Sequence, residues 1–464
     1  MSKTITMTHG NPLRLLFSFA LPLMCGNIFQ QLYTVVDTAI VGRGVGLDAL
    51  AALGTVDWLN WMLLGLAQGF TQGFSVKMAQ KYGEGDLAGL KKIIGQSALL
   101  SAGIAVVFTL LAQLGLPLFL TLLRVPPALM GMASLYSRIV IGGLPAIVFY
   151  NFCACVLRAV GDSKTPLKAM TVASVTNIAL DCVTVFVLRW GIAGAAAATV
   201  VSQCLSGCIC ALQIKKTPML HFGRAQLAPD SQQSLVLLKI GTPVAVKNVI
   251  IALGGMTLQT IVNGFGMSFI AGFTATNKLY GLLEIAAISY GYAVTTYVGQ
   301  NYGADLWERI KTGVRAAVVL SLATSVVIGT VMLLWGRPIT MLFISTEDPV
   351  TAVAAGDTAY LYLCFMAVSL PVLYLLYVYQ AALQGLGHTV VSMVSGIIEL
   401  VLRVSLATVV GITGFQTGIF GAEVSAWYGA AIFLMLSYYR TVRRLTAPDK
   451  RCYNKKNRKM EESL

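Results

Sequence analysis

Apolar stretches of about 20 residues recur along the whole of this 464-residue chain. A helix of that length crosses the roughly 30 Å hydrocarbon core of a bilayer, where every backbone polar group must find its partner within the protein. Charged residues make up only 11% of the sequence and hydrophobic residues 56%, whereas an ordinary soluble domain has about 25% charged residues. A soluble protein could not bury so much apolar surface, so we predict an all-α, polytopic membrane protein.

The apolar stretches form two sets of six. The first set is 15–38, 51–75, 93–116, 132–156, 167–189 and 193–213, and the second is 237–262, 269–298, 313–335, 357–384, 391–411 and 418–438. The longest polar break in this array, 214–236, separates the sets. We therefore predict twelve transmembrane helices with this division: an N-lobe over 1–213, a cytoplasmic linker over 214–236, a C-lobe over 237–440 and a basic cytoplasmic tail over 441–464.

The net charge of +14 is interpreted as topology, because loops rich in Lys and Arg remain in the cytoplasm. With the N-terminus inside, most of the 33 Lys and Arg fall on cytoplasmic segments, including the run that begins at Arg440. The external segments hold Arg43, Arg124, Arg189 and Arg337. This bias predicts cytoplasmic N- and C-termini in a plasma (inner) membrane. It also predicts that the basic tail contacts anionic lipid, not nucleic acid.

The two halves resemble each other at ordered Pro, Gly and Gln positions. The matches are Pro22 with Pro243, Gln80-Lys81-Tyr82-Gly83 with Gln300-Asn301-Tyr302-Gly303, Pro145 with Pro371, Leu157 with Leu383, and Gly161 with Gly387. Six spans per repeat give both halves the same orientation, so we expect an axis along the membrane normal and a central cleft between two lobes. Each of the four prolines removes a backbone hydrogen bond inside a span. They are therefore either bends that face the cleft or static kinks needed for packing.

Two acidic residues inside spans of the first half, Asp37 and Asp181, are candidates for an ion site. Asp37 precedes external Arg43, and Asp181 precedes external Arg189, so both acids lie at a similar depth in the outer half of the membrane. Neighbouring carboxylates in a low dielectric cannot both stay charged at low cost, so the pair takes up a proton or holds Na⁺. Asn177, one turn before Asp181, and hydroxyls such as that of Thr38 could assist. The alternative is a pair satisfied by neighbouring hydroxyls and amides, with no role in transport.

The second half carries a different set of charges. Glu399 and Arg403 are four residues apart, which favours a same-helix ion pair with a structural or gating role. Lys247, Lys278 and Glu284 could form another buried network or line the cleft. The acid pair therefore belongs to one half only, and the predicted ion site is asymmetric.

Aromatic and Met side chains within the spans could provide an adaptable surface for organic molecules. As a substrate cleft we consider Tyr33, Met62, Tyr150, Met256, Tyr280 and Glu284. Each of them, taken singly, is more often a packing residue. The sequence has no phosphate-binding Gly-x4-Gly-Lys-Ser/Thr loop, its three His form no nucleophile constellation, and its Cys follow no metal-binding pattern. We therefore expect neither an enzyme nor a bound cofactor.

These residues resemble the multidrug and toxic compound extrusion (MATE) transporters over nearly the whole chain. The resemblance rests on Gln30 to Thr38, Val41-Gly42-Arg43, Leu157 to Pro166, Asn177 with Asp181, and Gly299 to Ala304. It implies two six-helix lobes around a V-shaped cleft and export driven by inward H⁺ or Na⁺. Within the family the chain resembles the DinF-like and MepA-like branches more than the NorM-like branch. Asp37, Asn177 and Asp181 match the cation site of the DinF-like branch, and Tyr136 matches a tyrosine that accompanies that site. The second-lobe acids of the NorM-like branch are replaced here by Ile251 and His388.

We thus expect a secondary antiporter that exports organic, cationic or amphipathic compounds by alternating access of the two lobes, functional as a monomer. A flippase for lipid-linked precursors, from the wider superfamily, is an alternative that should have extra spans or a strongly cationic cleft. A channel is an alternative of a different class, which should not accumulate substrate against a gradient. The sequence does not decide between H⁺ and Na⁺, because both bind the same carboxylates.

Overall fold

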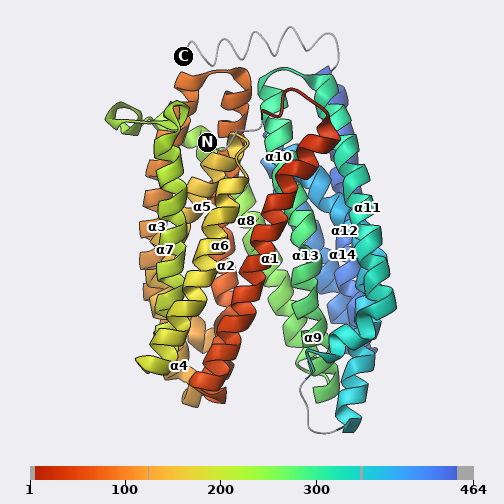
Figure 1. Ribbon diagram of the computed structural model, residues 1–464. Coiled ribbons are helices and arrows are strands. Elements are labelled where there is room, and N and C mark those ends of the chain that lie inside the picture. The colour runs from red at the N-terminus through yellow and green to blue at the C-terminus, as the bar shows by residue number, and fades with distance from the viewer. Residues whose placement is uncertain (1–5, 124, 345–348, 447–464) are drawn as a thin grey trace.

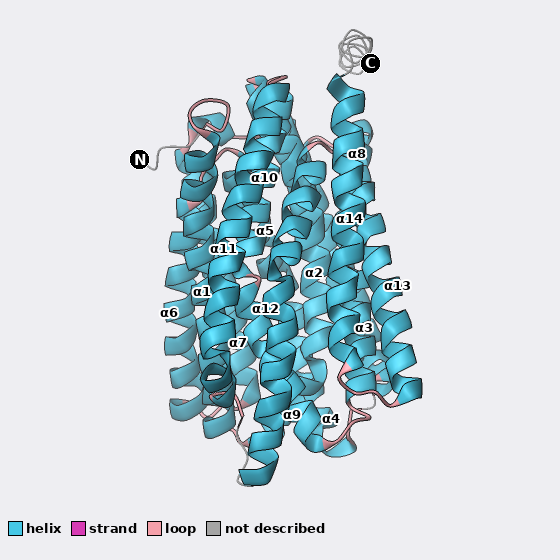
Figure 2. Ribbon diagram, turned by 90° about the vertical axis from the view of Figure 1, so that its right-hand side faces the viewer, coloured by secondary structure: helices cyan, strands magenta, loops and turns pink. Residues whose placement is uncertain are grey.

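The computed structural model describes residues 6–123, 125–344 and 349–446. Helices fill nearly all of this part of the chain, which contains no strand, and most of them run side by side along the long dimension of the molecule (Figures 1 and 2). In the first half the helices are α1 (Pro12–Gly44), α2 (Leu47–Glu84), α3 (Leu87–Leu122), α4 (Pro127–Gly142), α5 (Leu144–Ala159), α6 (Lys164–Asp181), the π-helix η1 (Cys182–Val187) and α7 (Ile192–Lys216).

The second half begins after two short 3₁₀ turns, η2 (Pro218–Leu220) and η3 (Arg224–Leu227). Its helices are α8 (Ser231–Val262), α9 (Met267–Leu283), α10 (Ile285–Gly303), α11 (Trp307–Met341), α12 (Pro349–Gly385), α13 (Thr389–Thr413) and α14 (Gly418–Thr446). Helix α14 continues the chain into the predicted basic tail as far as Thr446. The rest of that tail, and external Arg124, lie outside the described residues.

Polar side chains satisfy the first free N–H groups of several helices. The Asn11 side chain accepts from Leu13 N at 2.9 Å before α1, and Asp86 accepts from Gly89 N at 2.8 Å before α3. Gly85, which ends α2, has a φ of +75°, a left-handed conformation that a residue without a Cβ adopts at no steric cost. These local signals fix where long apolar helices begin and end.

Ten described helices are long and apolar enough to cross a bilayer, and the bent pair α4 and α5 makes an eleventh. The chain is therefore a multi-pass membrane protein. The span predicted over 269–298 corresponds to α9 and α10, which have 17 and 19 residues and meet at Glu284. The count by length and apolarity is one below the predicted twelve because this break divides one apolar stretch into two short helices.

The predicted prolines have different effects on their helices. Pro22, Pro243 and Pro371 lie inside the unbroken helices α1, α8 and α12. Pro145 lies in the first turn of α5, where α4 and α5 meet at an angle of 42°. A proline in a first helical turn leaves no hydrogen bond unmade, so the chain bends at this proline without losing one.

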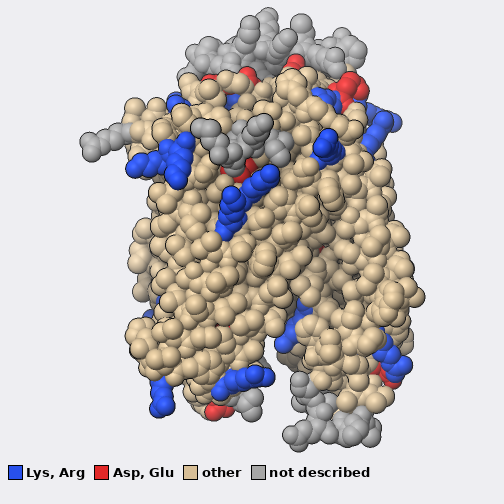
Figure 3. All heavy atoms as spheres, in the orientation of Figure 1, with Lys and Arg blue, Asp and Glu red and all other residues tan. Residues whose placement is uncertain are grey.

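The helices form two lobes, which α1 connects. Its beginning packs Leu16, Phe19 and Leu23 into the apolar core of the second half, whereas Ile40 and Val41 near its end belong to a core of the first half. Figure 1 shows α1 (red) running obliquely between the lobes. Figure 3 shows a hollow between the lobes, open at the end of the molecule opposite the start of α1. One helix therefore contacts both lobes along the cleft.

The lobes meet at their closed end through two equivalent glutamines. Gln80 Nε2 on α2 donates to the carbonyl oxygen of Gly385 at 3.0 Å, and Gln300 Nε2 on α10 donates to that of Ala159 at 2.8 Å. Gln80 and Gln300 are counterparts in the repeat. Ala159 and Gly385 are also counterparts, because each lies midway between a matched Leu and a matched Gly. We call these two hydrogen bonds the glutamine clasp.

Candidate ion and substrate site

Two buried carboxyl groups from different helices face each other in the first lobe. Asp37 on α1 is 8% exposed and Asp181, the last residue of α6, is 0% exposed. Their side chains lie at hydrogen-bonding distance. Among the described residues, no donor reaches Oδ1 of Asp37 or either carboxyl oxygen of Asp181. Two carboxylates can share this space only if a proton or a cation lies between them.

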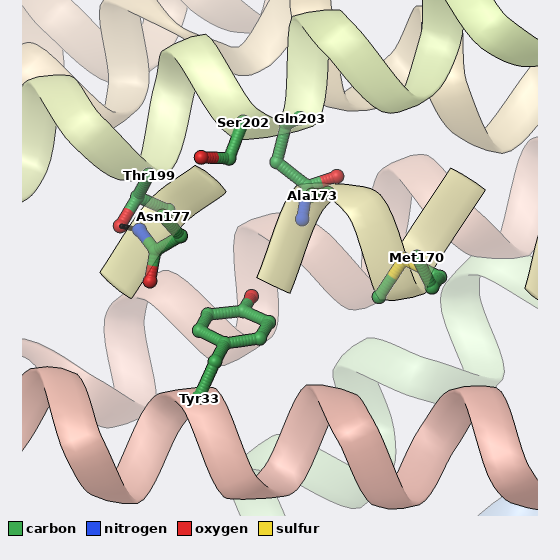
Figure 4. A pocket seen from close by; sticks show the side chains of 7 residues that line it. All are labelled: Tyr33, Met170, Ala173, Asn177, Thr199, Ser202 and Gln203. Carbon is green, nitrogen blue, oxygen red and sulfur yellow. Dashed lines mark hydrogen bonds between the residues drawn. The ribbon is translucent and has the colours of Figure 1, made fainter. Parts of the chain in front are cut away.

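An amide and a small pocket lie beside the acid pair. Asn177, which is 1% exposed, donates from Nδ2 to Thr199 Oγ1 on α7 at 3.5 Å, while its Oδ1 has no partner among the described residues. Figure 4 shows the pocket, into which the Tyr33 hydroxyl points. The lining residues are Tyr33, Met170, Ala173, Asn177, Thr199, Ser202 and Gln203. The free amide oxygen and the surrounding hydroxyls are suited to bind a small hydrated cation.

The other predicted members of the ion site lie at its edge. Tyr136 on α4 is within electrostatic reach of Asp37, Asp57 and Asp181. The Thr38 hydroxyl donates to the carbonyl oxygen of Thr34, one turn back on its own helix, at 2.8 Å. The tyrosine therefore adds a polar group close to the acids, whereas the threonine hydroxyl uses its proton within α1.

Asp57 on α2 is a further acidic residue within an apolar span that sequence reasoning missed. It lies next to Trp58, and its side chain is exposed. It acts electrostatically on Tyr136 from the first lobe and is itself influenced by Lys278 of α9 in the second lobe. The rule that singled out Asp37, an acid inside an apolar stretch, would also have found it.

The second lobe contains a buried ion pair between two helices. Arg403 Nη2 on α13 lies 2.7 Å from Glu423 Oε1 on α14, and both residues are buried. The predicted same-helix pair of Arg403 with Glu399 is therefore wrong as to its partner. The Glu399 Oε1 atom has no hydrogen-bond partner among the described residues. A neighbouring helix offers Arg403 a closer carboxylate than its own helix does.

Glu284 lies at the break between α9 and α10, surrounded by tyrosines. The Tyr377 hydroxyl donates to its Oε2 at 3.3 Å, and Tyr280 also hydrogen bonds it. Tyr374 donates to the carbonyl oxygen of the preceding residue, Leu283, at 2.8 Å. The Tyr280 ring stacks on Trp427 with ring centroids 5.7 Å apart. A carboxylate held among aromatic rings is suited to bind an organic cation.

The predicted substrate residues do not form one patch. Tyr33 lines the pocket beside the acid pair, while Tyr280 and Glu284 lie together in the second lobe. Met62 and Tyr150 are half-buried and pack against apolar cores of the first lobe, which indicates a packing role. Met256 is half-buried on α8.

Comparison with known proteins identifies relatives along the whole chain. The MatE family model matches residues 22–183 and 243–409, one match in each half. The chain is 29% identical over 441 residues to "Probable multidrug resistance protein YpnP" of Bacillus subtilis (strain 168), which covers 94% of this chain and 98% of the relative.

Two solved structures share the fold. A MOP superfamily transporter from Pyrococcus furiosus superposes with a TM-score of 0.90 at 23% identity, covering 96% of this chain and 99% of that one. A multidrug resistance MATE family transporter in an outward-facing conformation superposes with a TM-score of 0.89 at 23% identity, with the same coverage. The two-lobe architecture is therefore that of these transporters.

Proposed function

The chain belongs to the MATE family of transporters, and from that premise we propose that it is a secondary antiporter. It exports organic, cationic or amphipathic compounds in exchange for inward H⁺ or Na⁺, as a monomer in a plasma (inner) membrane with both termini in the cytoplasm. The observation that carries the proposal is the contact between Asp37 and Asp181, two buried carboxyl groups of which three oxygen atoms have no hydrogen-bond partner among the described residues. Such a pair needs a cation and is therefore suited to couple transport to an ion gradient.

Ion binding at the pair acts on α1. Neutralising the two carboxyls removes their repulsion and lets α1 and α6 approach at this depth, whereas loss of the ion pushes them apart. Because α1 also packs Leu16 and Phe19 into the second lobe, a change at Asp37 is transmitted to both sides of the cleft. The ion favours the lobe arrangement in which its site is best formed, and this difference in affinity drives the exchange.

Alternating access requires the glutamine clasp to open. In this structure the hollow opens at the end opposite the clasp (Figure 3), which corresponds to an outward-facing state if the termini are cytoplasmic. Access from the cytoplasm then requires the hydrogen bonds of Gln80 and Gln300 to break. Each is a bond between neutral groups worth about 1 kcal/mol, so the differential ion affinity can supply the cost.

Uptake of a fluorescent organic cation into inverted vesicles tests the proposal. A pH gradient and a Na⁺ gradient are applied separately, and we expect one of them to drive accumulation. Asp37→Asn should abolish the ion-driven component while leaving the folded yield and the thermal unfolding temperature unchanged. Asp48→Asn, at the exposed start of α2, is the matched control and should transport normally.

Two outcomes would contradict this function. Accumulation that neither gradient drives would exclude antiport. Equal transport by wild type and Asp37→Asn would exclude the acid pair as the coupling site. Equilibration without accumulation would instead indicate a channel.

A further inference from the structure

The segment before α1, residues 6–10, contacts the second lobe at the closed end of the cleft, and we call it the strap. The Met7 N–H donates to Oε1 of Gln300 on α10 at 2.9 Å, and Asn301 Nδ2 donates to the Met7 carbonyl oxygen at 3.1 Å. The Met7 side chain is 0% exposed and belongs to the apolar core of the second lobe. Met7 therefore anchors the strap on that lobe.

Arg309, near the start of α11, directs its guanidinium group to the strap. Nη2 donates to the carbonyl oxygen of Met7 at 3.1 Å and Nη1 to that of Gly10 at 3.0 Å. Nε donates to Asn301 Oδ1 at 3.1 Å, and Asn301 itself holds the same Met7 oxygen. A planar fork of five donors holds two carbonyl oxygens at a fixed separation, which a lysine ammonium group does less well. Gln300, Asn301 and Arg309 therefore form a cradle for a peptide, and the strap occupies it.

One amide group belongs to both the strap and the glutamine clasp. Gln300 accepts the Met7 N–H through Oε1 and donates through Nε2 to the carbonyl oxygen of Ala159 in the first lobe. An amide oxygen only accepts and an amide nitrogen only donates, so the Met7 N–H fixes which end of the side chain faces Ala159. If the amide turned over, two oxygen atoms would face each other and the clasp bond would be lost. The docked strap therefore positions Gln300 for its bond to the first lobe.

The corresponding segment of the second half is held in a reciprocal way but does not reach the clasp. The end of the linker, which precedes α8, lies on the first lobe, where Gln96 Nε2 on α3 donates to the carbonyl oxygens of Gln226 at 3.0 Å and Ala228 at 2.6 Å. Within the described ranges, no hydrogen bond joins the linker to Gln80, whose printed partner is Gly385. In this part of the chain, the strap therefore positions one clasp bond and the linker positions neither.

The strap is bonded on one side and bordered by open space on the other. Thr6 and Thr8 line a cavity of about 260 Å³ together with Tyr82 and Leu87 of the first lobe. Gly10, at the other end of the strap, has a φ of +90°, although a Cβ there would meet only ordinary van der Waals contacts. Residues with a Cβ rarely adopt that conformation. The turn at Gly10 therefore directs the strap into its cradle, and the strap can leave the cradle without unpacking the first lobe.

We propose that the strap is a lock on the closed end of the cleft. Docked in its cradle, it keeps Gln300 bonded to Ala159, and it must leave the cradle before this end opens. The strap continues into α1, which begins at Pro12, so a displacement of the start of α1 acts directly on Met7. The inference goes beyond antiport, because it concerns how the closed end is held and not which ion or compound is exchanged.

Two measurements on the full-length protein in nanodiscs test the lock. Hydrogen–deuterium exchange of the peptide that contains Met7 reports docking, and spin-label distances between the ends of α2 and α10 report the open population. Arg309→Met removes the bonds to the two strap carbonyls but not the bond to the Met7 N–H. We expect it to accelerate exchange at Met7 and to raise the open population about fivefold, as for the loss of one net hydrogen bond.

Gly10→Ala perturbs the strap without changing the cradle. Because alanine rarely adopts a φ of +90°, this variant should also accelerate exchange at Met7 and raise the open population severalfold. The double variant with Arg309→Met should open no further than the stronger single variant, since both act through the same docking. Arg315→Met, which replaces an exposed arginine of the same helix α11, is the matched control and should behave as wild type.

The lock is overturned if Arg309→Met and Gly10→Ala accelerate exchange at Met7 while the spin-label distances stay as in wild type, because the strap then leaves without opening this end. Unchanged exchange in both variants would overturn the cradle itself. Thermal unfolding in the same nanodiscs identifies a variant that does not fold, and the other variant then decides. Neither measurement uses an ion gradient or a substrate, so a failure of antiport would leave both results standing.

Discussion

Gln300 and Gly83 lie so close together that a Cβ on the glycine would collide with the glutamine's carbonyl oxygen. In the same way, a Cβ on Gly303 would collide with the backbone carbonyl oxygen of Gln80. Each lobe therefore presses a glutamine onto a glycine of the other lobe, at the closed end of the cleft. The backbone packing and the side-chain bonds of the glutamine clasp act together to hold this end shut.

Gly83→Ala should keep the lobes from closing at this end. The added methyl group meets backbone atoms, which cannot move aside. We therefore expect the closed arrangement to be destabilised by about 1–3 kcal/mol and transport to be reduced. Gly303→Ala should have the same effect. Gly103→Ala is the control, because open space surrounds that position on α3. Spin-label distances between the ends of α2 and α10 measure the separation, and distances unchanged in both variants would contradict the packing argument.

Gln80→Ala and Gln300→Ala should each favour opening toward the clasp end. Loss of one hydrogen bond worth about 1 kcal/mol increases the open population about fivefold, and the double variant should add the two effects. The same spin-label pair reports the populations. Gln300 also accepts from the Met7 N–H at 2.9 Å, so the Gln300 variant should open more than the Gln80 variant. Equal opening in the two variants would show that the N-terminal contact contributes nothing, and the reverse order would contradict the prediction.

Glu423→Gln should destabilise the second lobe by about 3–5 kcal/mol, because it leaves the Arg403 guanidinium buried without its counter-charge. Glu399→Gln should lower the stability of the second lobe by less, because Glu399 is not the carboxylate paired with Arg403. Thermal unfolding of the two variants in the same detergent makes the comparison. A larger loss of stability for Glu399→Gln than for Glu423→Gln would show that Glu399 is the main partner of Arg403.

An ion pair between α3 and the linker should respond to acid. Lys92 Nζ lies 2.7 Å from Asp230 Oδ2, and this hydrogen bond holds the pKa of Asp230 below its usual range. A lowered pKa stabilises the fold above the ordinary carboxyl value of about 4 and ceases to do so as the pH falls through the lowered value. Lys92→Met should therefore lose less stability than wild type between about pH 5 and pH 3. Lys91→Met is the neighbouring control and should follow wild type.

Most of the architecture could be predicted from the sequence because a bilayer imposes length and apolarity on every span. The break at Glu284 could not, since no proline precedes it and the residues on either side are as apolar as those of unbroken helices. Pro371 lies inside the continuous helix α12, so a proline within a span does not by itself end a helix.

The proximity of Asp37 and Asp181 was predictable because it depends on depth in the membrane. Asp37 and Asp181 could be placed at one level because each lies a short distance before an external arginine. The partner of Arg403 depends on which helix lies beside α13, and spacing along one helix carries no information on that. Packing between helices also decides that the start of α1 contacts the second lobe.

The glutamine clasp has the symmetry of a homodimer. In the first half the patch consists of Gln80, Gly83 and the helix end at Ala159. Its copy in the second half consists of Gln300, Gly303 and Gly385, and the two patches contact each other reciprocally. Interfaces between identical subunits are isologous in this sense. Here both copies are on one polypeptide, so a substitution in one repeat is felt by the other and cannot be compensated within its own half.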